Sequence, residues 1–595
     1  MISSKKITLI GILLITVVFA LTLYAVLFPS GFTNEASVGE VIFSEEHSVL
    51  MSEDDYYTSY TGHGTVKLEL RGNTATTSSR KVTVNGGDIT ISGGGAYIVS
   101  GTLTSGSITV DSSDGIPVRL ILGGVSVTSE NGSALVIKNA DKTVLSLVDG
   151  TENTFTDGEA YNAYKDTENA PTAAIYSRDD LTINGKGTLK VNGRAYDGIK
   201  VNDTLRITDG TVIVDAKDEG INVNDGIYIL GSSISISSVS DAVRCESDTP
   251  ENSFIALDGT TLSLVSAQGD GISCSGAIYS DGAVADVKTG GGSEAVQLSS
   301  GGFGGGRGGF GGAGGNAGSD GSSTKAIKAG TLLRINGGEY KLDGKDDTVH
   351  SDGDIEITGG NFTLSSGNDA IHADKTLLLS PESIDITKCL EGIEAGFITI
   401  ENGNISIVSS DDAINAVGTG SGGFGMPMGN STQPVSEEKV YLTIKGGSIY
   451  AETGGDGVDS NGAARISGGT VYVFGPENGG NGSLDFQDGL LIDGGNLLAA
   501  GSSGMAELPH RDSLQTSLSF YLSESFNAGS TIDIKDEDGN IVIGGISSKR
   551  FNWVCASTPT LRESESYTLF VNDKERSTLT VDSNVTSNRA NSTRR

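Results

Sequence analysis

Short runs of alternating apolar and polar residues follow one another along most of the chain, separated by Gly, Asn and Asp. In residues 197–218, "DGIKVNDTLRITDGTVIVDAKD", three such runs rich in Val, Ile, Leu and Thr are divided by Asn-Asp, Asp-Gly and Lys-Asp. Alternation with a period of two between turn residues is typical of β-strands, and each run is too short for an α-helix. The pattern predicts an all-β chain.

The pattern also repeats. An acidic residue, a small residue and then Ile, Val or Leu recur, most often at a step of 22 residues, as from 197 to 219 and from 347 to 369. The acids are Asp197, Glu219, Asp241, Asp270, Glu294, Asp347, Asp369, Glu391, Asp412, Asp456 and Asp488, and Lys325 fills the slot between Glu294 and Asp347. Three strands per repeat, without a hairpin or a helical crossover, predict a parallel β-helix whose turns pair at a spacing of about 4.8 Å.

Three longer intervals contain inserts, at 247–253, 300–323 and 418–438. Each insert follows an aligned acidic motif, so we expect all three to leave the coil at the same edge. The second and third are rich in glycine, which is typical of loops rather than domains. Binding sites are often found where loops overhang a rigid scaffold.

The two ends of the chain lack the repeat. Residues 7–28 form an uncharged, mainly apolar run after Lys5 and Lys6. Its length predicts a membrane anchor with the remainder on the extracellular side, or alternatively a cleaved signal peptide and secretion. The predicted division is 1–30 anchor or signal peptide, 31–80 linker and N-terminal cap, 81–500 β-helix, and 501–595 a small C-terminal β cap with a polar tail.

Charge limits the possible partners. The chain has 75 acidic and 40 basic residues and a net charge of −35. This excess argues against nucleic acid as a partner and favours divalent cations. We expect a monomer whose only membrane contact is the N-terminal segment. Aromatic platforms for neutral sugars are scarce, and Trp553 is the one tryptophan.

The acids of successive turns should form columns at one bend of the coil. Like charges about 5 Å apart repel by about 1 kcal/mol in water, and a calcium ion between turns would remove the conflict because it takes oxygen ligands. The predicted calcium ligands are Asp218, Glu219, Asp346, Asp347, Asp352, Asp369, Asp374, Asp411 and Asp412. The alternative is that acids at these bends only satisfy nearby backbone groups.

Two histidines lie beside these acids. In "DAIHAD", alternation places Ile371 and Ala373 inward and His372 outward, and His350 should lie outward one turn away. Calcium prefers oxygen, so His350 and His372 are predicted to contact a ligand, or alternatively to form hydrogen bonds beside the ion, rather than to bind the ion itself. Cys245 and Cys274 should stack inward on successive turns, either as a disulfide or as two packed thiols.

Residues 88–158, beginning "DITISGGGAYIVSGTL", the "DAIHAD"-like turns and "GGNLLAAGSSGMAELP" at 494–509 resemble a known family. It is the clostridial-type carbohydrate-binding β-helix family of a cellulosome-producing bacterium, and the resemblance covers about 81–570. It implies a right-handed parallel β-helix similar to that of pectate lyases, bound calcium, and binding of cellulose and acidic pectic sugars. Lys325 and the long apolar N-terminus depart from the pattern.

The favoured function is therefore calcium-dependent binding of plant-type polysaccharide outside the cell, without catalysis. Calcium shared with uronate carboxylates would join an acidic protein to an acidic sugar. One alternative is a pectate-lyase-like enzyme, in which outward Lys200, Arg244 or Lys328 would be the base. The other is a non-catalytic surface adhesin or stalk.

Overall fold

The computed structural model describes residues 39–42, 48–58, 64–159, 161, 170–247, 249–250, 253–297, 323–418 and 435–589. The predicted membrane anchor lies outside these residues, as do most of the two glycine-rich inserts. In the described part of the chain, no helix combines the length and apolar character needed to cross a bilayer. The chain divides into two compact units, 1–56 and 57–595.

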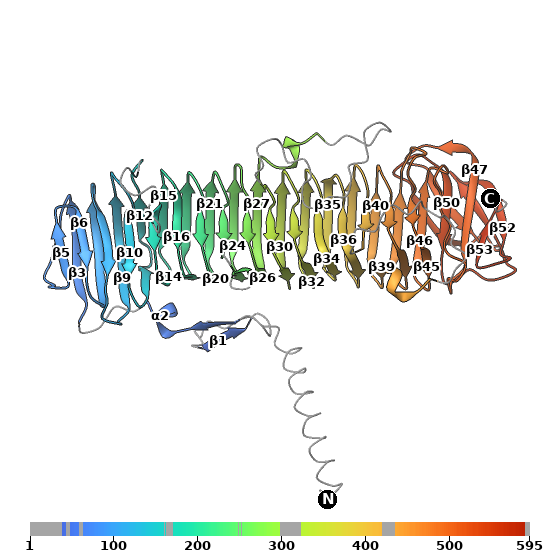
Figure 1. Cartoon of the computed structure of the whole chain (residues 1–595). Coiled ribbons are helices and arrows are strands. Elements are labelled where there is room, and N and C mark those ends of the chain that lie inside the picture. The colour runs from blue at the N-terminus through green and yellow to red at the C-terminus, as the bar shows by residue number, and fades with distance from the viewer. Residues whose placement is uncertain are drawn as a thin grey trace, which may run out of the picture. The chain divides into compact units, whose positions relative to one another are not determined.

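The first unit contains an antiparallel pair and one short helix: β1 (Gly39–Ile42), β2 (Ser48–Met51) and α2 (Glu53–Tyr56). The second unit is a parallel β-helix of about 15 turns, stacked in chain order along one axis (Figure 1). Its strands form three faces because each turn bends three times. The predicted fold, with three short strands per turn, is confirmed.

The first face begins at the bend that carries the acidic motif. Its strands are β6 (Asp88–Ile91), β8 (Ser107–Asp111), β10 (Leu135–Asn139), β13 (Ala173–Ser177), β16 (Asp197–Val201), β19 (Ile221–Val223), β22 (Val243–Cys245), β25 (Ile272–Cys274), β28 (Ile327–Ala329), β31 (Val349–Ser351), β34 (Ile371–Leu379), β36 (Ile393–Ile400), β38 (Ile414–Ala416), β41 (Val458–Ser460) and β44 (Leu484–Phe486). Strands β34 and β36 continue round the bend into the second face.

The second face consists of β3 (Val66–Gly72), β7 (Gly95–Leu103), β9 (Val118–Thr128), β11 (Thr143–Leu147), β14 (Leu181–Gly185), β17 (Thr204–Thr208), β20 (Gly226–Leu230), β23 (Phe254–Asp258), β26 (Ala277–Asp281), β29 (Leu332–Ile335), β32 (Asp354–Ile357), β39 (Val440–Ile444), β42 (Ala463–Ile466) and β45 (Gly489–Ile492). The long strands β7 and β9 also continue, into the third face.

The third face consists of β12 (Glu152–Thr156), β15 (Thr188–Gly193), β18 (Thr211–Ala216), β21 (Ser233–Ser238), β24 (Thr261–Ser266), β27 (Ala283–Thr289), β30 (Gly338–Gly344), β33 (Asn361–Ser366), β35 (Ser383–Cys389), β37 (Asn404–Ser409), β40 (Ser448–Glu452), β43 (Thr470–Phe474) and β46 (Asn496–Gly501). At the N-terminal end, β4 (Ala75–Thr77) and β5 (Val82–Asn85) pair antiparallel with β3 and β6.

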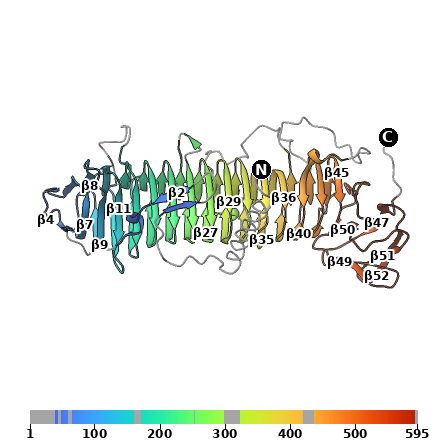
Figure 2. The same cartoon turned by 90° about the horizontal axis from the view of Figure 1, so that it is seen from below.

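Mainly antiparallel strands cover the last turn. They are β47 (Ser517–Phe526), β48 (Thr531–Lys535), β49 (Ile541–Ile546), β50 (Phe551–Ser557), β51 (Ser566–Val571), β52 (Lys574–Thr580) and β53 (Val585–Ser587). β50 pairs with β46, and a separate core that includes Phe520, Val554 and Tyr567 forms behind it. Figure 2 shows β47, β49, β50, β51 and β52 together at the C-terminal end of the stack. This cap shields the open edge of the stack.

The alignment of the acidic motifs was wrong at Glu294. This residue lies in a short 3-10 helix, η2 (Ser293–Ala295), within the connection between β27 and β28, and Ile272 of β25 pairs directly with Ile327 of β28. The three inserts therefore do not share one edge. The inserts near 247–253 and 418–438 leave after a strand of the first face, whereas the insert near 300–323 leaves before one.

The core consists of ladders of identical or similar side chains. Ile183, Ile207 and Ile229 lie on successive turns in exact register and are fully buried. Stacked strands repeat the same inward position at every turn, so the apolar residues that alternate in the sequence form continuous columns. The hydrophobic effect along these columns stabilises the stack.

Replacing Ile207 with alanine should therefore lower the free energy of unfolding by about 2 to 5 kcal/mol, the usual cost of a buried Ile-to-Ala cavity. Ile213 is the matched control, because it lies on the next strand with 36% of its surface exposed. Ile213→Ala should change stability by less than about 1 kcal/mol. Urea unfolding of the two variants makes the comparison, and equal losses would contradict the assigned strand orientation.

Candidate functional site

Two rows of side chains run along the first face. The outward row contains the middle residues of its strands, paired from turn to turn: Lys200, Asn222, Arg244, Ser273, Lys328, His350, His372, Glu394, Asn415, Asp459 and Asp485. The bend row contains the residues that begin the repeats: Asp197, Glu219, Asp241, Asp270, Lys325, Asp347, Asp369, Glu391, Asp412 and Asp456. The predicted columns of acids therefore exist, beside a second row of mixed charge.

The acids of the bend row have a structural role. Asp241 Oδ1 accepts a hydrogen bond from the backbone N of Asp270 at 2.7 Å, and Asp270 Oδ1 accepts one from the N of Lys325 at 2.7 Å. Asp412 Oδ1 accepts a hydrogen bond from the backbone N of Asp456 at 2.5 Å. One oxygen of each carboxylate thus joins two turns, which is the structural alternative to metal binding. The second oxygen remains for other partners.

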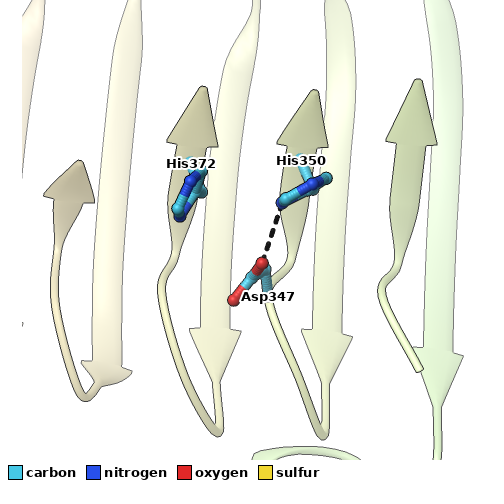
Figure 3. Close-up of side chains that lie close together, drawn as sticks. All are labelled: Asp347, His350 and His372. Atoms are coloured by element: carbon cyan, nitrogen blue, oxygen red, sulfur yellow. Dashed lines mark hydrogen bonds and ion pairs between the residues drawn. The ribbon is translucent and has the colours of Figure 1, made fainter. Parts of the chain in front are cut away.

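Lys325 neutralises the pair Asp346 and Asp347. Its Nζ lies 2.9 Å from Asp346 Oδ2 and 2.8 Å from Asp347 Oδ2. Asp347 Oδ2 also lies 2.9 Å from His350 Nδ1 (Figure 3). Burial opposes ionisation of Asp347, but the hydrogen bond from His350 and the charge of Lys325 outweigh it and hold its pKa well below the usual range.

The two histidines stack on successive turns with ring centroids 5.0 Å apart (Figure 3). Each ring lies between two carboxylates. His350 Nε2 is 2.9 Å from Asp352 Oδ1, and the nitrogens Nδ1 and Nε2 of His372 lie 3.0 Å from Asp369 Oδ2 and 3.2 Å from Asp374 Oδ1. Burial opposes the imidazolium form of His372, but the hydrogen bond and charge of Asp369 raise its pKa to about 9.

The predicted metal ligands therefore do not form one site. Asp346 and Asp347 contact Lys325, and Asp352 and Asp374 contact the histidines. Asp218 and Glu219 converge with Asp197, and one oxygen from each of the three lies within 4.8 Å of the others. Asp411 and Asp412 have no lysine, arginine or histidine within ion-pair distance in the described part of the chain.

The set Asp197, Asp218 and Glu219 fits calcium, because all three donors are carboxylate oxygens on neighbouring turns. Burial and repulsion from the charge of Glu219 raise the pKa of Asp197 to about 8. Arg244 Nη1, 2.8 Å from Glu219 Oε1, offsets part of this charge. The pair Asp346 and Asp347 does not fit calcium, since the ammonium group of Lys325 occupies the position of a cation.

Acids accumulate in both rows toward the C-terminal end of the first face. Burial and neighbouring carboxylates raise the pKa of Asp412 to about 9, of Asp459 to about 8 and of Glu394 to about 9. Alternation alone did not single out Glu394 and Asp459. The signal that could have found them is their position three residues after an acid of the repeat, where Arg244 and His350 also lie.

A cleft of about 630 Å³ opens over the first face. Arg244 and Lys328 lie on either side of Ser273, whose small side chain leaves room between them, and Asp241 and Asp270 line the bend. All three candidate lyase bases, Lys200, Arg244 and Lys328, belong to the outward row. Among the described residues, no carboxylate lies within ion-pair distance of Lys328, whereas Lys200 Nζ lies 3.8 Å from Asp197 Oδ2.

Cys245 and Cys274 lie beneath this cleft. They pair in register on β22 and β25, both are buried, and both are free thiols. The Sγ atom of Cys245 lies 3.4 Å from the carbonyl oxygen of Asp225, and the Sγ atom of Cys274 lies 3.5 Å from that of Ala277. The two cysteines are therefore packed thiols, the second of the two predicted states.

Comparison with known proteins shows similarities to proteins described as carbohydrate-binding or polysaccharide lyase-like. Residues 85–370 match the family described as "Carbohydrate-binding domain-containing protein". A protein of the same description from Acetivibrio thermocellus is 40% identical over 129 residues, which are 22% of this chain and 45% of that protein. The alignment therefore spans less than half the length of this curated relative.

A solved structure, described as a polysaccharide lyase-like protein from C. thermocellum and determined as a gadolinium derivative, is also similar. It has 20% sequence identity and a TM-score of 0.30, and the match covers 59% of this chain and 96% of that chain. The resemblance noted in the sequence, to carbohydrate-binding β-helix proteins, is confirmed by the family match. The segment that matches the family, residues 85–370, contains the cleft, the set around Glu219 and His350, and it ends before His372.

Removal of Lys325 should destabilise the protein. Lys325→Met leaves Asp346 and Asp347 without their cation, and the Asp347 side chain is only 3% exposed. Removing one partner of a buried ion pair lowers the free energy of unfolding by about 3 to 5 kcal/mol. The matched control is Lys341→Met, because Lys341 is 70% exposed and pairs with Asp286 at the surface; we expect less than about 1 kcal/mol there. Urea unfolding measures both, and equal losses would contradict the role of Lys325.

Stability without divalent cations should fall as pH rises. Asp197, Asp412, Asp459 and Glu394 have raised pKa values of about 8, 9, 8 and 9, so the folded chain holds protons that the unfolded chain releases above about pH 4. The free energy of unfolding then decreases from about pH 4 to about pH 9.

The melting temperature in EDTA, measured at about pH 5 and about pH 8, checks this expectation. It should be lower at the higher pH, and added calcium should raise it more at the higher pH, where the carboxylates are ionised. A melting temperature in EDTA that stays constant or rises with pH would contradict the assignment.

Proposed function

We propose that this protein binds acidic polysaccharide in the cleft of the first face, with calcium held by Asp197, Asp218 and Glu219. The observation that carries the proposal is the cleft itself, in which Arg244 and Lys328 lie on either side of the small Ser273. Two cations on one open face of a chain with net charge −35 are suited to uronate carboxylates.

The residues of the cleft have complementary roles in this proposal. Arg244 and Lys328 are two turns apart, about 10 Å at strand spacing, and both would donate hydrogen bonds to carboxylate oxygens of the sugar chain. Asp241 and Asp270 line the bend beside them and can accept hydrogen bonds from sugar hydroxyl groups. Arg244 also reaches Glu219, so the cleft adjoins the calcium ligands.

Calcium at Asp197, Asp218 and Glu219 supplies positive charge beside the cleft, to which uronate groups are attracted. The convergence of three carboxylate oxygens supports this assignment. The calcium-binding role first predicted for Asp346, Asp347, Asp352, Asp369 and Asp374 is not part of the proposal, because Lys325 and the histidines already contact these groups.

The proposal favours acidic over neutral chains. Cellulose is usually bound on exposed aromatic faces, but Trp553 is fully buried and its Nε1 donates to Ser519 Oγ at 2.9 Å. Phe303, Phe310 and Phe424 lie outside the described residues. The proposal also includes an extracellular location, membrane-anchored or secreted, which the apolar run at 7–28 supports.

Isothermal titration of the full chain with oligogalacturonate tests the proposal. Binding should require calcium and disappear in EDTA. Arg244→Ala and Lys328→Ala should each weaken binding by about 10-fold to 100-fold, the value of one charge-assisted hydrogen bond. Asp197→Asn should weaken calcium binding itself. Lys341→Ala, which removes an exposed cation of the third face, is the control and should bind normally.

Each outcome of this titration tests a different part of the proposal: the role of calcium, the position of the site, or saccharide binding itself. Binding that is insensitive to EDTA would overturn the role of calcium, and binding that is insensitive to both cleft variants would overturn the position of the site. Absence of any saccharide binding would leave the adhesin or stalk as the function. Release of an ultraviolet-absorbing unsaturated uronide during the incubation would identify a lyase, for which Lys328, unpaired with any described carboxylate, is the favoured base.

A further inference from the structure

Three side chains on two successive turns converge away from the cleft. Asp369 precedes β34, His372 belongs to β34, and Glu394 belongs to β36. His372 Nδ1 lies 3.0 Å from Asp369 Oδ2 and 3.9 Å from Glu394 Oε1. One potential metal-ligating atom of each residue lies within 4.8 Å of the other two.

Neighbouring residues orient these three side chains. His372 Nδ1 lies 3.0 Å from Asp369 Oδ2 and Nε2 lies 3.2 Å from Asp374 Oδ1, so each ring nitrogen directs a proton toward a carboxylate in the metal-free chain. A metal ion would displace the proton on Nδ1, while the proton on Nε2 would stay with Asp374. Asn415 Nδ2 donates to Glu394 Oε2 at 3.2 Å and to Glu391 Oε2 at 3.1 Å. A carboxylate that holds the second nitrogen of an imidazole is the usual partner of a metal-binding histidine.

His372 is the basic side chain that pairs with the carboxyl groups of this cluster. In the described part of the chain, no lysine or arginine lies within ion-pair distance of Asp369 or Glu394. This distinguishes it from the neighbouring cluster of Asp347 and His350, where the ammonium group of Lys325 lies 2.8 Å from Asp347 Oδ2. In addition, Asn415 Oδ1 is buried without a hydrogen-bond partner among the described residues. The cluster thus combines two carboxyl groups and an imidazole, with no lysine or arginine of the described residues paired to either carboxyl group.

We propose that Asp369, His372 and Glu394 bind a divalent first-row transition metal ion, with zinc as the test case. One nitrogen and two carboxylate oxygens are a typical donor set for such ions, whereas calcium takes oxygen alone. Once an ion has displaced the protons of the cluster, two carboxylates and a neutral imidazole carry a charge of −2, which the divalent ion cancels. The side chains of His372 and Glu394 are 22% and 20% exposed, so the ion can enter from solvent.

This site is separate from the calcium ligands around Glu219 and does not depend on saccharide binding. The ion would also connect two adjacent turns of the β-helix, since its ligands come from β34 and β36. His372 also lies near Asp347 and His350, so the Glu394 variant is the one that reports on this cluster specifically. Failure of the saccharide-binding proposal would leave the zinc site intact.

Zinc titration of the full chain tests the inference. The protein is stripped with a chelator, returned to saturating calcium without saccharide, and titrated with zinc chloride in a calorimeter. We expect one zinc ion per chain that calcium does not displace. His372→Gln and Glu394→Gln should each reduce the affinity by at least about 100-fold, and Asp374→Asn by about 10-fold to 100-fold.

The matched control is His350→Gln. His350 stacks on His372 but contacts Asp347 and Asp352, so the variant should bind zinc as the unmodified protein does. Equal loss in the two histidine variants, unchanged affinity in His372→Gln, or stoichiometric displacement of zinc by calcium would each overturn the proposal. If His372→Gln fails to fold, the Asp374→Asn variant decides, because unchanged affinity there would also overturn it.

Discussion

The constraint on which this structure depends is that parallel turns stack in register, so that each residue has the equivalent residue of the next turn about 4.8 Å away. In the core this repetition is favourable, since Ile183, Ile207 and Ile229 form one continuous apolar column. On the surface the same repetition places acids above acids. On the first face, hydrogen bonds and ion pairs to the stacked acids offset this repulsion.

Along the first face, the groups that offset the repulsion between acids change from turn to turn. Backbone N–H groups of the following turn take one oxygen of many bend-row acids. Arg244, Lys325 and the two histidines supply positive charge in the first two thirds of the stack. Beyond Glu394 no such group contacts the acids Asp412, Asp456 and Asp459 in the described part of the chain. Among the described residues, the acids of the first face are therefore paired with basic groups in its earlier turns and unpaired in its later turns, and the cleft proposed to bind saccharide lies in the earlier turns.

Most of the fold could be predicted from the sequence because a 22-residue period fixes strand number, strand order and the inward positions together. The error at Glu294 arose because "EAV" matches the motif by composition, although backbone pairing passes directly from β25 to β28. The site was only partly predictable. Lys325 stood out as a departure from the acidic pattern, but its partners, Asp346 and Asp347, are on the next turn. Which charges meet across turns depends on side-chain direction, and the repeat does not encode that direction.

The connection between β27 and β28 has a wider consequence. Residues 290–326 lie between two strands that belong to consecutive turns, and yet Ile272 and Ile327 pair as closely as neighbours without an insert. Corners of this coil therefore accept long segments while the ladder beside them keeps its register. Loop length and composition can diversify independently of the scaffold, so new specificities can arise by exchanging corner segments rather than by redesigning the core.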